Sequence, residues 1–255
     1  MTSLTSLSPT VDVRRAGDRF KTRLSWLDSK HSFSFSRHHD PGNTHHGLLV
    51  VNNDDTVIPG TGFETHPHRD MEIVTWVLQG SLVHQDSRGN SGIIYPGLAQ
   101  RMSAGTGIMH SEKNDSWRIA GERHDEPVHF VQMWVVPDES AITPGYEQLE
   151  IDHDLLSGGL VTVASGMAPH ADAAAIRIKN RYAALHAARL QTGQSVELPT
   201  APFLHLFVPR GVVTLEGTGQ LGTGDAVRFT ASGGQRVKAC EPAEILVWEM
   251  HATLG

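Results

Sequence analysis

The feature that most constrains the fold is a repeated rhythm of short β-prone runs separated by turn residues. Runs rich in β-branched and aromatic residues, such as residues 71–78 and 128–136, alternate with clusters of Gly, Pro and Asn, such as residues 59–62 and 86–92. The turn clusters recur about every 8 to 12 residues, and no long stretch shows helical periodicity. This rhythm is typical of antiparallel sheets that close into a barrel or stack as a sandwich. We therefore predict an all-β chain.

Two expectations concern individual strands. Residues 32–36 alternate strictly between serine and phenylalanine, which predicts a half-buried strand with Phe33 and Phe35 directed inward. The β-prone runs at residues 71–78 and 81–84 are separated only by Gln79 and Gly80, which predicts a hairpin. Residues 1–25 are expected to form a polar arm that leads into a first strand.

Composition excludes several classes of protein. At 255 residues the chain forms one large or two ordinary domains, and 39% hydrophobic with 19% charged residues is the balance of a soluble globular protein. The net charge of -7 argues against a nucleic-acid footprint. Cys240 is the single cysteine, which excludes an intramolecular disulfide and a cysteine-rich zinc site. Because the first residues lack an apolar signal segment and no stretch has the length of a membrane span, we expect a cytoplasmic protein without membrane contact.

Histidines and acidic residues occur in two pairs with the same spacing. His66 and His68 are two residues apart, and His110 and Glu112 repeat this spacing about forty residues later. On a strand, residues i and i+2 point to the same face, roughly 6.6 Å apart. Two neighbouring strands could therefore offer three imidazoles and one carboxylate to a single divalent transition metal. Glu72 stays open as a ligand, because it shares the strand parity of His66 and His68 if no bulge intervenes.

Other histidines receive a structural interpretation. The adjacent pairs His38-His39 and His45-His46 flank a turn, and such pairs are usually solvated. His205 has no partner at i+2 and is expected to be a structural residue.

The flanking residues extend the metal-site pattern into a family resemblance. Gly60, His66-x-His68, Glu72 and Gly80, followed by Gly105-x-Gly107-x-x-His110-x-x-x-Asn114, resemble the two motifs of the cupin superfamily, with Gly105 at a position where cupins normally carry Pro. Three longer segments resemble the pirin family of bicupins: His66-Pro67-His68-Arg69-Asp70-Met71-Glu72-Ile73-Val74-Thr75, His84-x-Asp86-Ser87, and Met102-Ser103-Ala104-Gly105-x-Gly107-Ile108-x-His110-Ser111-Glu112. The resemblance covers roughly residues 20–136.

The resemblance implies a ligand set and an activity. Many cupins use the glutamate of the first motif as fourth ligand, whereas pirins use the carboxylate two residues after the histidine of the second motif. The implied ligands are thus His66, His68, His110 and Glu112, with Glu72 near the edge of the pocket. Because bacterial pirins are similar to quercetin 2,3-dioxygenases, the resemblance implies cleavage of a flavonol by O2, with Glu112 also taking the proton of the flavonol 3-hydroxyl. We expect one divalent transition metal, and iron is the favoured choice. Copper, manganese, nickel and cobalt are also compatible with these donors.

Two other functions fit the same residues. The protein could be a redox-sensitive, metal-containing regulator that acts on protein partners, as eukaryotic pirins do by resemblance. It could also be an isomerase or a sugar-handling cupin, in which the metal only polarises a carbonyl. A requirement for O2 separates the dioxygenase from both alternatives.

The second half repeats the rhythm of the first without its ligand pairs. From residue 181 onward, short strands alternate with glycine turns, as in a barrel half. We therefore predict two cupin barrels in tandem: residues 1–137 with the metal site, and residues 138–255 without metal ligands. The connection at residues 137–180 is expected to hold a strand or a short helix.

Overall fold

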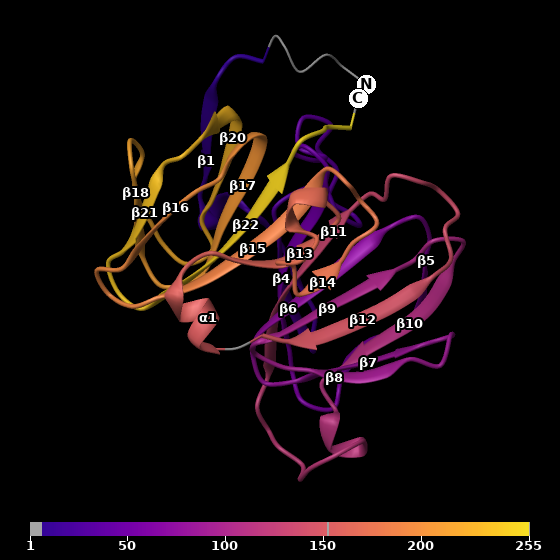
Figure 1. Cartoon of the computed structure of the whole chain (residues 1–255). Coiled ribbons are helices and arrows are strands. Elements are labelled where there is room, and N and C mark those ends of the chain that lie inside the picture. Colours follow the sequence, from indigo (N-terminus) through magenta and orange to yellow (C-terminus); the bar gives the residue numbers. More distant parts are fainter. Residues whose placement is uncertain (1–6, 152, 255) are drawn as a thin grey trace.

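Strands make up nearly all of the regular structure in the computed structural model, which describes residues 7–151 and 153–254 (Figure 1). The strands of the first half are β1 Thr10–Arg14, β2 Phe20–Arg23, β3 Leu27–His31, β4 Leu49–Val57, β5 Gly62–His68, β6 Glu72–Gln79, β7 Leu82–Asp86, β8 Ser91–Ile94, β9 Leu98–Ser103, β10 Ile108–Lys113, β11 Val128–Val135 and β12 Gly145–Glu150. Those of the second half are β13 Val161–Ser165, β14 Ile176–Arg177, β15 Ala183–Leu190, β16 Ser195–Glu197, β17 Thr200–Arg210, β18 Val213–Leu215, β19 Gly219–Leu221, β20 Ala226–Gly233, β21 Arg236–Ala239 and β22 Ala243–Met250. The helical segments are α1 His153–Gly158 and the 3-10 turns Ala16–Asp18, Ser116–Arg118 and Ala168–His170. The predicted all-β class is confirmed.

Each half combines a seven-stranded sheet with a four-stranded sheet. In the first half the order β12-β9-β6-β11-β4-β3-β2 accompanies the order β5-β10-β7-β8. In the second half the order β1-β20-β17-β22-β15-β13-β14 accompanies the order β16-β21-β18-β19. Neighbouring strands pair antiparallel, apart from the short parallel pair β13 and β14. The two halves are therefore two barrel-like units of the same design, as predicted, and the connection holds β12 and α1.

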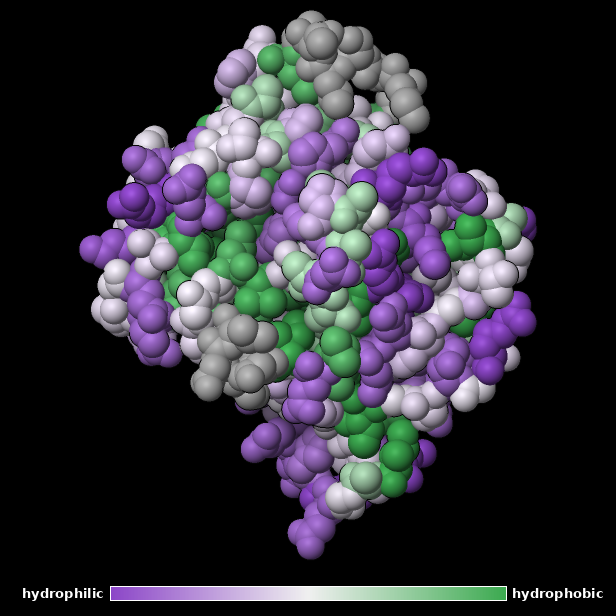
Figure 2. All heavy atoms as spheres, viewed as in Figure 1, coloured by the Kyte–Doolittle hydropathy of each residue, from purple (hydrophilic) through white to green (hydrophobic). Residues whose placement is uncertain are grey.

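The two large sheets share a hydrophobic core. The largest buried cluster joins Trp76 and Met133 of the first half to Phe207 and Trp248 of the second half. A buried hydrogen bond crosses the same junction, because Trp76 Nε1 donates to Glu244 Oε1 at 2.6 Å. On the face seen in Figure 2, hydrophilic side chains cover most of the periphery, and hydrophobic ones gather mainly near the middle. None of the described helices is long and apolar enough to cross a membrane.

Division of the chain at the predicted boundary, residue 137, leaves two strands in the sheet of the opposite half. Strand β1 pairs with β20 over five residues, from Thr10 opposite Thr230 to Arg14 opposite Ala226. Strand β12, which follows the boundary in sequence, pairs with β9 of the first half. The halves are thus joined by hydrogen-bonded strands as well as by the shared core.

Two local predictions are wrong. Residues 32–36 form no regular strand, because β3 ends at His31 and Ser36 has a φ of 53°, which turns the chain. Phe33 is buried as expected, but Phe35 is only partly buried and packs edge-on against Trp134.

The predicted hairpin of residues 71–84 does not form either. Strand β6 lies between β9 and β11, whereas β7 lies in the other sheet, between β8 and β10. Gly80, with a φ of 74°, carries the chain from one sheet to the other.

Gly105 supports the turn between β9 and β10, and replacing it is expected to destabilise the fold strongly. Its φ is 45°, and an added Cβ would overlap the carbonyl oxygen of Ile142. Gly105→Ala should lower the free energy of unfolding in urea by roughly 3 kcal/mol or more, because backbone strain and a backbone clash add together. The matched control is Gly89→Ala, since Gly89 also has a positive φ but an added Cβ meets nothing within 4 Å. In Gly89→Ala the free energy of unfolding should fall by only about 1 kcal/mol. Equal losses in the two variants would contradict the clash.

Candidate metal centre

Pairing of β5 with β10 brings the predicted ligand pairs together. The two strands run antiparallel, with His66 opposite His110 and His68 opposite Ile108. The pairing shifts between His110 and Glu112, because β5 has one extra residue between Phe63 and His66. Donor atoms of His66, His68 and His110 all lie within 4.8 Å of one another. Three histidines predicted from sequence spacing alone therefore form one cluster.

The hydrogen bonds around these rings leave lone pairs facing one another. His66 Nδ1 must carry its proton, because it lies 2.7 Å from the carbonyl oxygen of Glu64, which can only accept. His66 Nε2 is therefore unprotonated in the neutral ring, and it lies 3.1 Å from His110 Nε2. His68 Nε2 is buried without a hydrogen-bond partner among the described residues. Two nitrogen ligands bound at about 2.1 Å to one ion at right angles would be ~3 Å apart, so this arrangement fits a metal ion.

His84 and Asp86 fix the orientation of the His110 ring through contacts that begin at its Nδ1 atom. His84 Nε2 lies 3.4 Å from Asp86 Oδ2, and His84 Nδ1 lies 3.4 Å from His110 Nδ1. One set of protons satisfies both contacts: His84 Nε2–H donates to Asp86, and His110 Nδ1–H donates to His84 Nδ1. His110 Nε2 is then unprotonated and free to bind a cation. Such second partners of metal-binding histidines set the tautomer and the ring orientation.

Burial and neighbouring rings keep the imidazoles of His68 and His110 neutral. Burial, followed by the neighbouring rings of His110 and His66, lowers the pKa of His68 to about 4. Burial, followed by the rings of His66 and His84, lowers the pKa of His110 to about 3. Neutral imidazole is the form that binds metal, so His68 and His110 can bind without first releasing protons at neutral pH.

Glu112 lies beside the cluster and is held by a chain of hydrogen bonds. Its Oε2 is 4.0 Å from His110 Nε2, and with His84 and His110 it forms a second group of donor atoms within 4.8 Å. Gln132 Nε2 lies 2.9 and 2.8 Å from the two oxygens of the buried Glu112 carboxylate. Trp134 Nε1 in turn donates to Gln132 Oε1 at 3.0 Å. Gln132 therefore sets the position of Glu112 from the neighbouring sheet.

Sequence reasoning missed His84 and Gln132 as parts of the site. His84 appeared only within a family motif, and Gln132 lies in a strand whose other residues are mostly apolar. The available signal for Gln132 was its position on β11, two residues from Trp134, where a lone amide among buried side chains requires polar partners.

Gln132→Met is expected to weaken catalysis without unfolding the protein. The substitution keeps the side-chain volume but removes the donor to both oxygens of Glu112, so the carboxylate loses its fixed position. Turnover should fall roughly 10- to 100-fold, the range found for partners of metal ligands. Gln85→Met on β7 is the matched control, because Gln85 is exposed. Unchanged turnover in Gln132→Met, with normal thermal unfolding, would contradict this role.

Glu72 lies outside both donor groups of this site. It is fully buried at the start of β6, where its Oε2 accepts hydrogen bonds from Ser103 Oγ and from the backbone N–H of Lys179, both at 2.9 Å. Burial raises the pKa of Glu72. Its contacts tie β6 to β9 and to the connection between the halves.

Several histidines outside the predicted ligand set have other partners. His46 Nε2 donates to the carbonyl oxygen of Phe229 at 3.0 Å, and the pKa of His46 is lowered to about 4, chiefly by burial. In the second half, His170, His186 and Glu249 form a further group of donor atoms within 4.8 Å. Partners already occupy these side chains: His186 Nε2 and His251 Nε2 contact the two oxygens of Glu249 at 3.0 and 2.7 Å, and His170 Nδ1 lies 3.1 Å from Ser165 Oγ.

Two tandem barrel-like units, one of which carries converging histidines on adjacent strands, define a bicupin with a candidate metal centre. A family model described as "Pirin" matches residues 12–135, and one described as "Quercetinase C-terminal cupin domain" matches residues 162–250. The chain belongs to the pirin family.

Related proteins resemble the chain over nearly its full length. A protein of Mycobacterium tuberculosis that bears the name "Putative quercetin 2,3-dioxygenase" is 63% identical over 249 residues, which is 98% of each chain. The "Quercetin 2,3-dioxygenase" of Escherichia coli K12 is 35% identical and covers 94% of this chain and 98% of its own. The crystal structure of Escherichia coli YhhW has a TM-score of 0.84 at 32% identity and covers 96% of this chain and all of that one. A second structure describes the same bacterial pirin in complex with nickel(II), with a TM-score of 0.82.

Proposed function

We propose that the protein is a metal-dependent dioxygenase of the quercetin 2,3-dioxygenase type, which cleaves a flavonol with O2. The observation that carries this proposal is the cluster of unprotonated imidazole nitrogens beside the buried Glu112 carboxylate. Names of relatives at 63% and 35% identity support the same activity. Among the described residues, no other group of potential metal ligands has both ring nitrogens whose lone pairs face one another and a buried ring nitrogen without a hydrogen-bond partner.

His66, His68, His110 and Glu112 are the ligands that we assign to the metal. A divalent transition metal held by these four groups would supply open positions for a substrate oxygen and for O2. Iron is our first choice, and copper, manganese, nickel and cobalt accept the same nitrogen and oxygen donors. The related bacterial pirin in complex with nickel(II) supports binding of a divalent ion by this chain.

Glu112 is the group that we assign to proton transfer. Its carboxylate accepts from Gln132 and lies 4.0 Å from His110 Nε2, at the edge of the histidine cluster. Taking the proton of the flavonol 3-hydroxyl would leave a flavonolate, the electron-rich form that reacts with O2.

An open groove beside His66 offers an approach for a flat aromatic substrate. The groove has a volume of about 540 Å³ and is lined by Trp26, Phe63 and His66 among others. The rings of Trp26 and Phe63 pack edge to face at 5.2 Å. Aromatic walls next to a polar centre are the usual composition of a site for a small aromatic ligand.

The test measures O2 uptake together with the loss of quercetin absorbance. Purified protein is reconstituted separately with iron, copper, manganese and nickel and compared with a chelator-treated sample. The proposal requires equimolar consumption of quercetin and O2 that depends on the metal. Turnover that continues without O2 would favour the isomerase, and absence of consumption with every metal despite one bound ion per chain would favour the regulator.

A further inference from the structure

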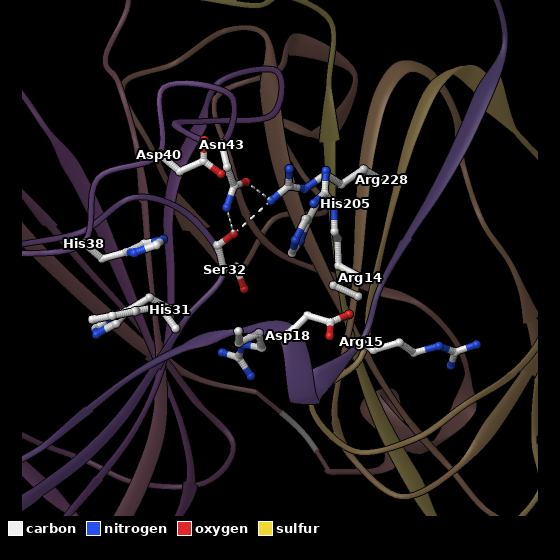
Figure 3. A pocket seen from close by; sticks show the side chains of 13 residues that line it. Arg14, Arg15, Asp18, His31, Ser32, His38, Asp40, Asn43, His205 and Arg228 are labelled. Atoms are coloured by element: carbon white, nitrogen blue, oxygen red, sulfur yellow. Dashed lines mark hydrogen bonds between the residues drawn. The ribbon is translucent and has the colours of Figure 1, made fainter.

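A second polar cavity lies at the junction of the two halves, between β1 and β20 on one side and the loop after β3 on the other (Figure 3). Its volume is about 180 Å³, and its lining includes Arg14, Arg19, Ser32, Asn43, His205 and Arg228. None of the residues assigned to the metal lines it. The side chains drawn in Figure 3 come from both halves of the chain.

Arg228 carries a buried charge that is only partly compensated. The residue is 7% exposed, and its Nη2 donates to the carbonyl oxygen of Ser32 at 2.9 Å and to Asn43 Oδ1 at 2.7 Å (Figure 3). Its Nε has no hydrogen-bond partner, and no carboxylate of the described residues forms an ion pair with it. The Phe33 ring lies under the guanidinium, 4.4 Å from Cζ to centroid. Burial lowers the pKa of Arg228 to about 10, so the group is still charged at neutral pH.

His205 adds unsatisfied donors and acceptors to the same cavity. It is 1% exposed, and neither ring nitrogen has a hydrogen-bond partner among the described residues. An imidazole carries at least one N–H in either tautomer, so a buried donor is unsatisfied whichever tautomer is present. Buried polar groups of this kind are rare, and each one requires an explanation.

The charges around the cavity leave the Arg228 guanidinium without a carboxylate in ion-pair contact. Three of its four arginines contact carboxylates: Arg14 with Asp12 at 2.7 Å, Arg15 with Asp225 at 2.7 Å, and Arg19 with Asp54 at 3.1 Å. The lining carboxylates Asp18 and Asp40 are exposed, so water screens them. Arg228 forms no such pair: Asp12, its cross-strand partner on β1, attracts it but makes its ion pair with Arg14. Water could satisfy the free N–H groups but would supply no charge, whereas a small anion supplies both.

We propose that this cavity binds a small oxyanion, with carboxylate or phosphate chemistry, between the Arg228 guanidinium and His205. Oxygen atoms of the anion accept from Arg228 Nε–H and from the ring N–H of His205, which pairs the buried charge.

The experiment titrates the purified full-length protein with inorganic phosphate and, separately, with formate. Heat of binding and the thermal unfolding temperature are recorded at constant ionic strength set by sodium chloride. We expect saturable binding of one anion per chain and a rise of the unfolding temperature with anion concentration. The affinity should be the same after chelator treatment, since phosphate could otherwise bind a metal. Stronger binding of phosphate or of formate identifies which source of the oxyanion the cavity prefers.

Two variants and one control locate the binding site. Arg228→Gln should weaken binding at least about tenfold, because a charged hydrogen-bond donor is lost. His205→Leu keeps the volume and removes the unpartnered nitrogens, so without anion it should unfold at the same or a higher temperature, yet lose most of the anion-dependent rise. Arg23→Gln, an arginine with a 70% exposed side chain outside the cavity, should bind like the unchanged protein.

Two results would overturn the proposal. One is the absence of saturable binding of both anions by the unchanged protein. The other is binding that Arg228→Gln and His205→Leu leave unaltered, since the anion would then bind elsewhere. Neither readout involves quercetin turnover, so failure of this proposal and failure of the proposed dioxygenase activity are separate results.

Discussion

His110→Ala is expected to abolish both metal retention and turnover. His110 is the residue on which the whole centre converges, since its Nε2 faces His66 at 3.1 Å and its Nδ1 faces His84 at 3.4 Å. Removing the ring takes away one ligand, so His66 can no longer hold a metal ion jointly with His110. Metal content should fall from about one ion per chain to below about 0.1, and turnover at least ~1000-fold, because a metal bound by fewer ligands is readily lost. Elemental analysis and O2 uptake measure the two effects.

The matched control is His39→Ala, since His39 is exposed and belongs to neither donor group of the site. It should retain full metal and activity. Circular dichroism establishes that both variants are folded. Retained metal in folded His110→Ala would refute the ligand assignment.

Glu112→Gln is expected to have the second largest effect. The amide is nearly isosteric with the carboxylate, but it carries no charge to offset that of a divalent ion and takes no proton from a substrate hydroxyl. Turnover should fall by roughly 100- to 10,000-fold, the usual contribution of a positioned general base. Metal content should fall as well, because one of the four assigned ligands is weakened.

Glu72→Gln separates the pirin-type ligand set from the one common in other cupins. Glu72 is also buried, but it accepts from Ser103 and from the Lys179 backbone rather than facing the histidines. Its amide variant should therefore keep its full metal content. Metal loss in Glu72→Gln together with full retention in Glu112→Gln would reverse the assignment of the fourth ligand.

Local sequence rules predicted the class of fold and the meeting of the histidines. The i, i+2 spacing of His66 and His68 fixed their common face, and glycines such as Gly105 and Gly107 marked the turn before His110. The same spacing in His110 and Glu112 predicted two neighbouring strands, and β5 and β10 are indeed neighbours, with His66 opposite His110.

Pairing between distant strands was not predictable from local signals. The short Gln79-Gly80 connection looks like a hairpin turn, but seven of the eight residues of β6 are buried. A strand buried to this extent needs neighbours on both edges, and β9 and β11 provide them. Likewise, nothing near Phe35 in sequence indicates that Trp134 packs against it, because that contact depends on how the whole sheet folds. The role of Gln132 was not predictable for the same reason, since it depends on Glu112, which lies on another sheet.

The pairing of β1 with β20 has a consequence for the synthesis of the protein. Ribosomes make the chain from its N-terminus, so Thr10–Arg14 is completed more than 200 residues before its partner Ala226–Gly233 emerges. During that interval β1 exposes an unpaired edge, and the first barrel can form while this strand waits. Partial chains that end before residue 226 would therefore carry a free strand able to pair with another copy, which makes translational arrest in this region a route to aggregation.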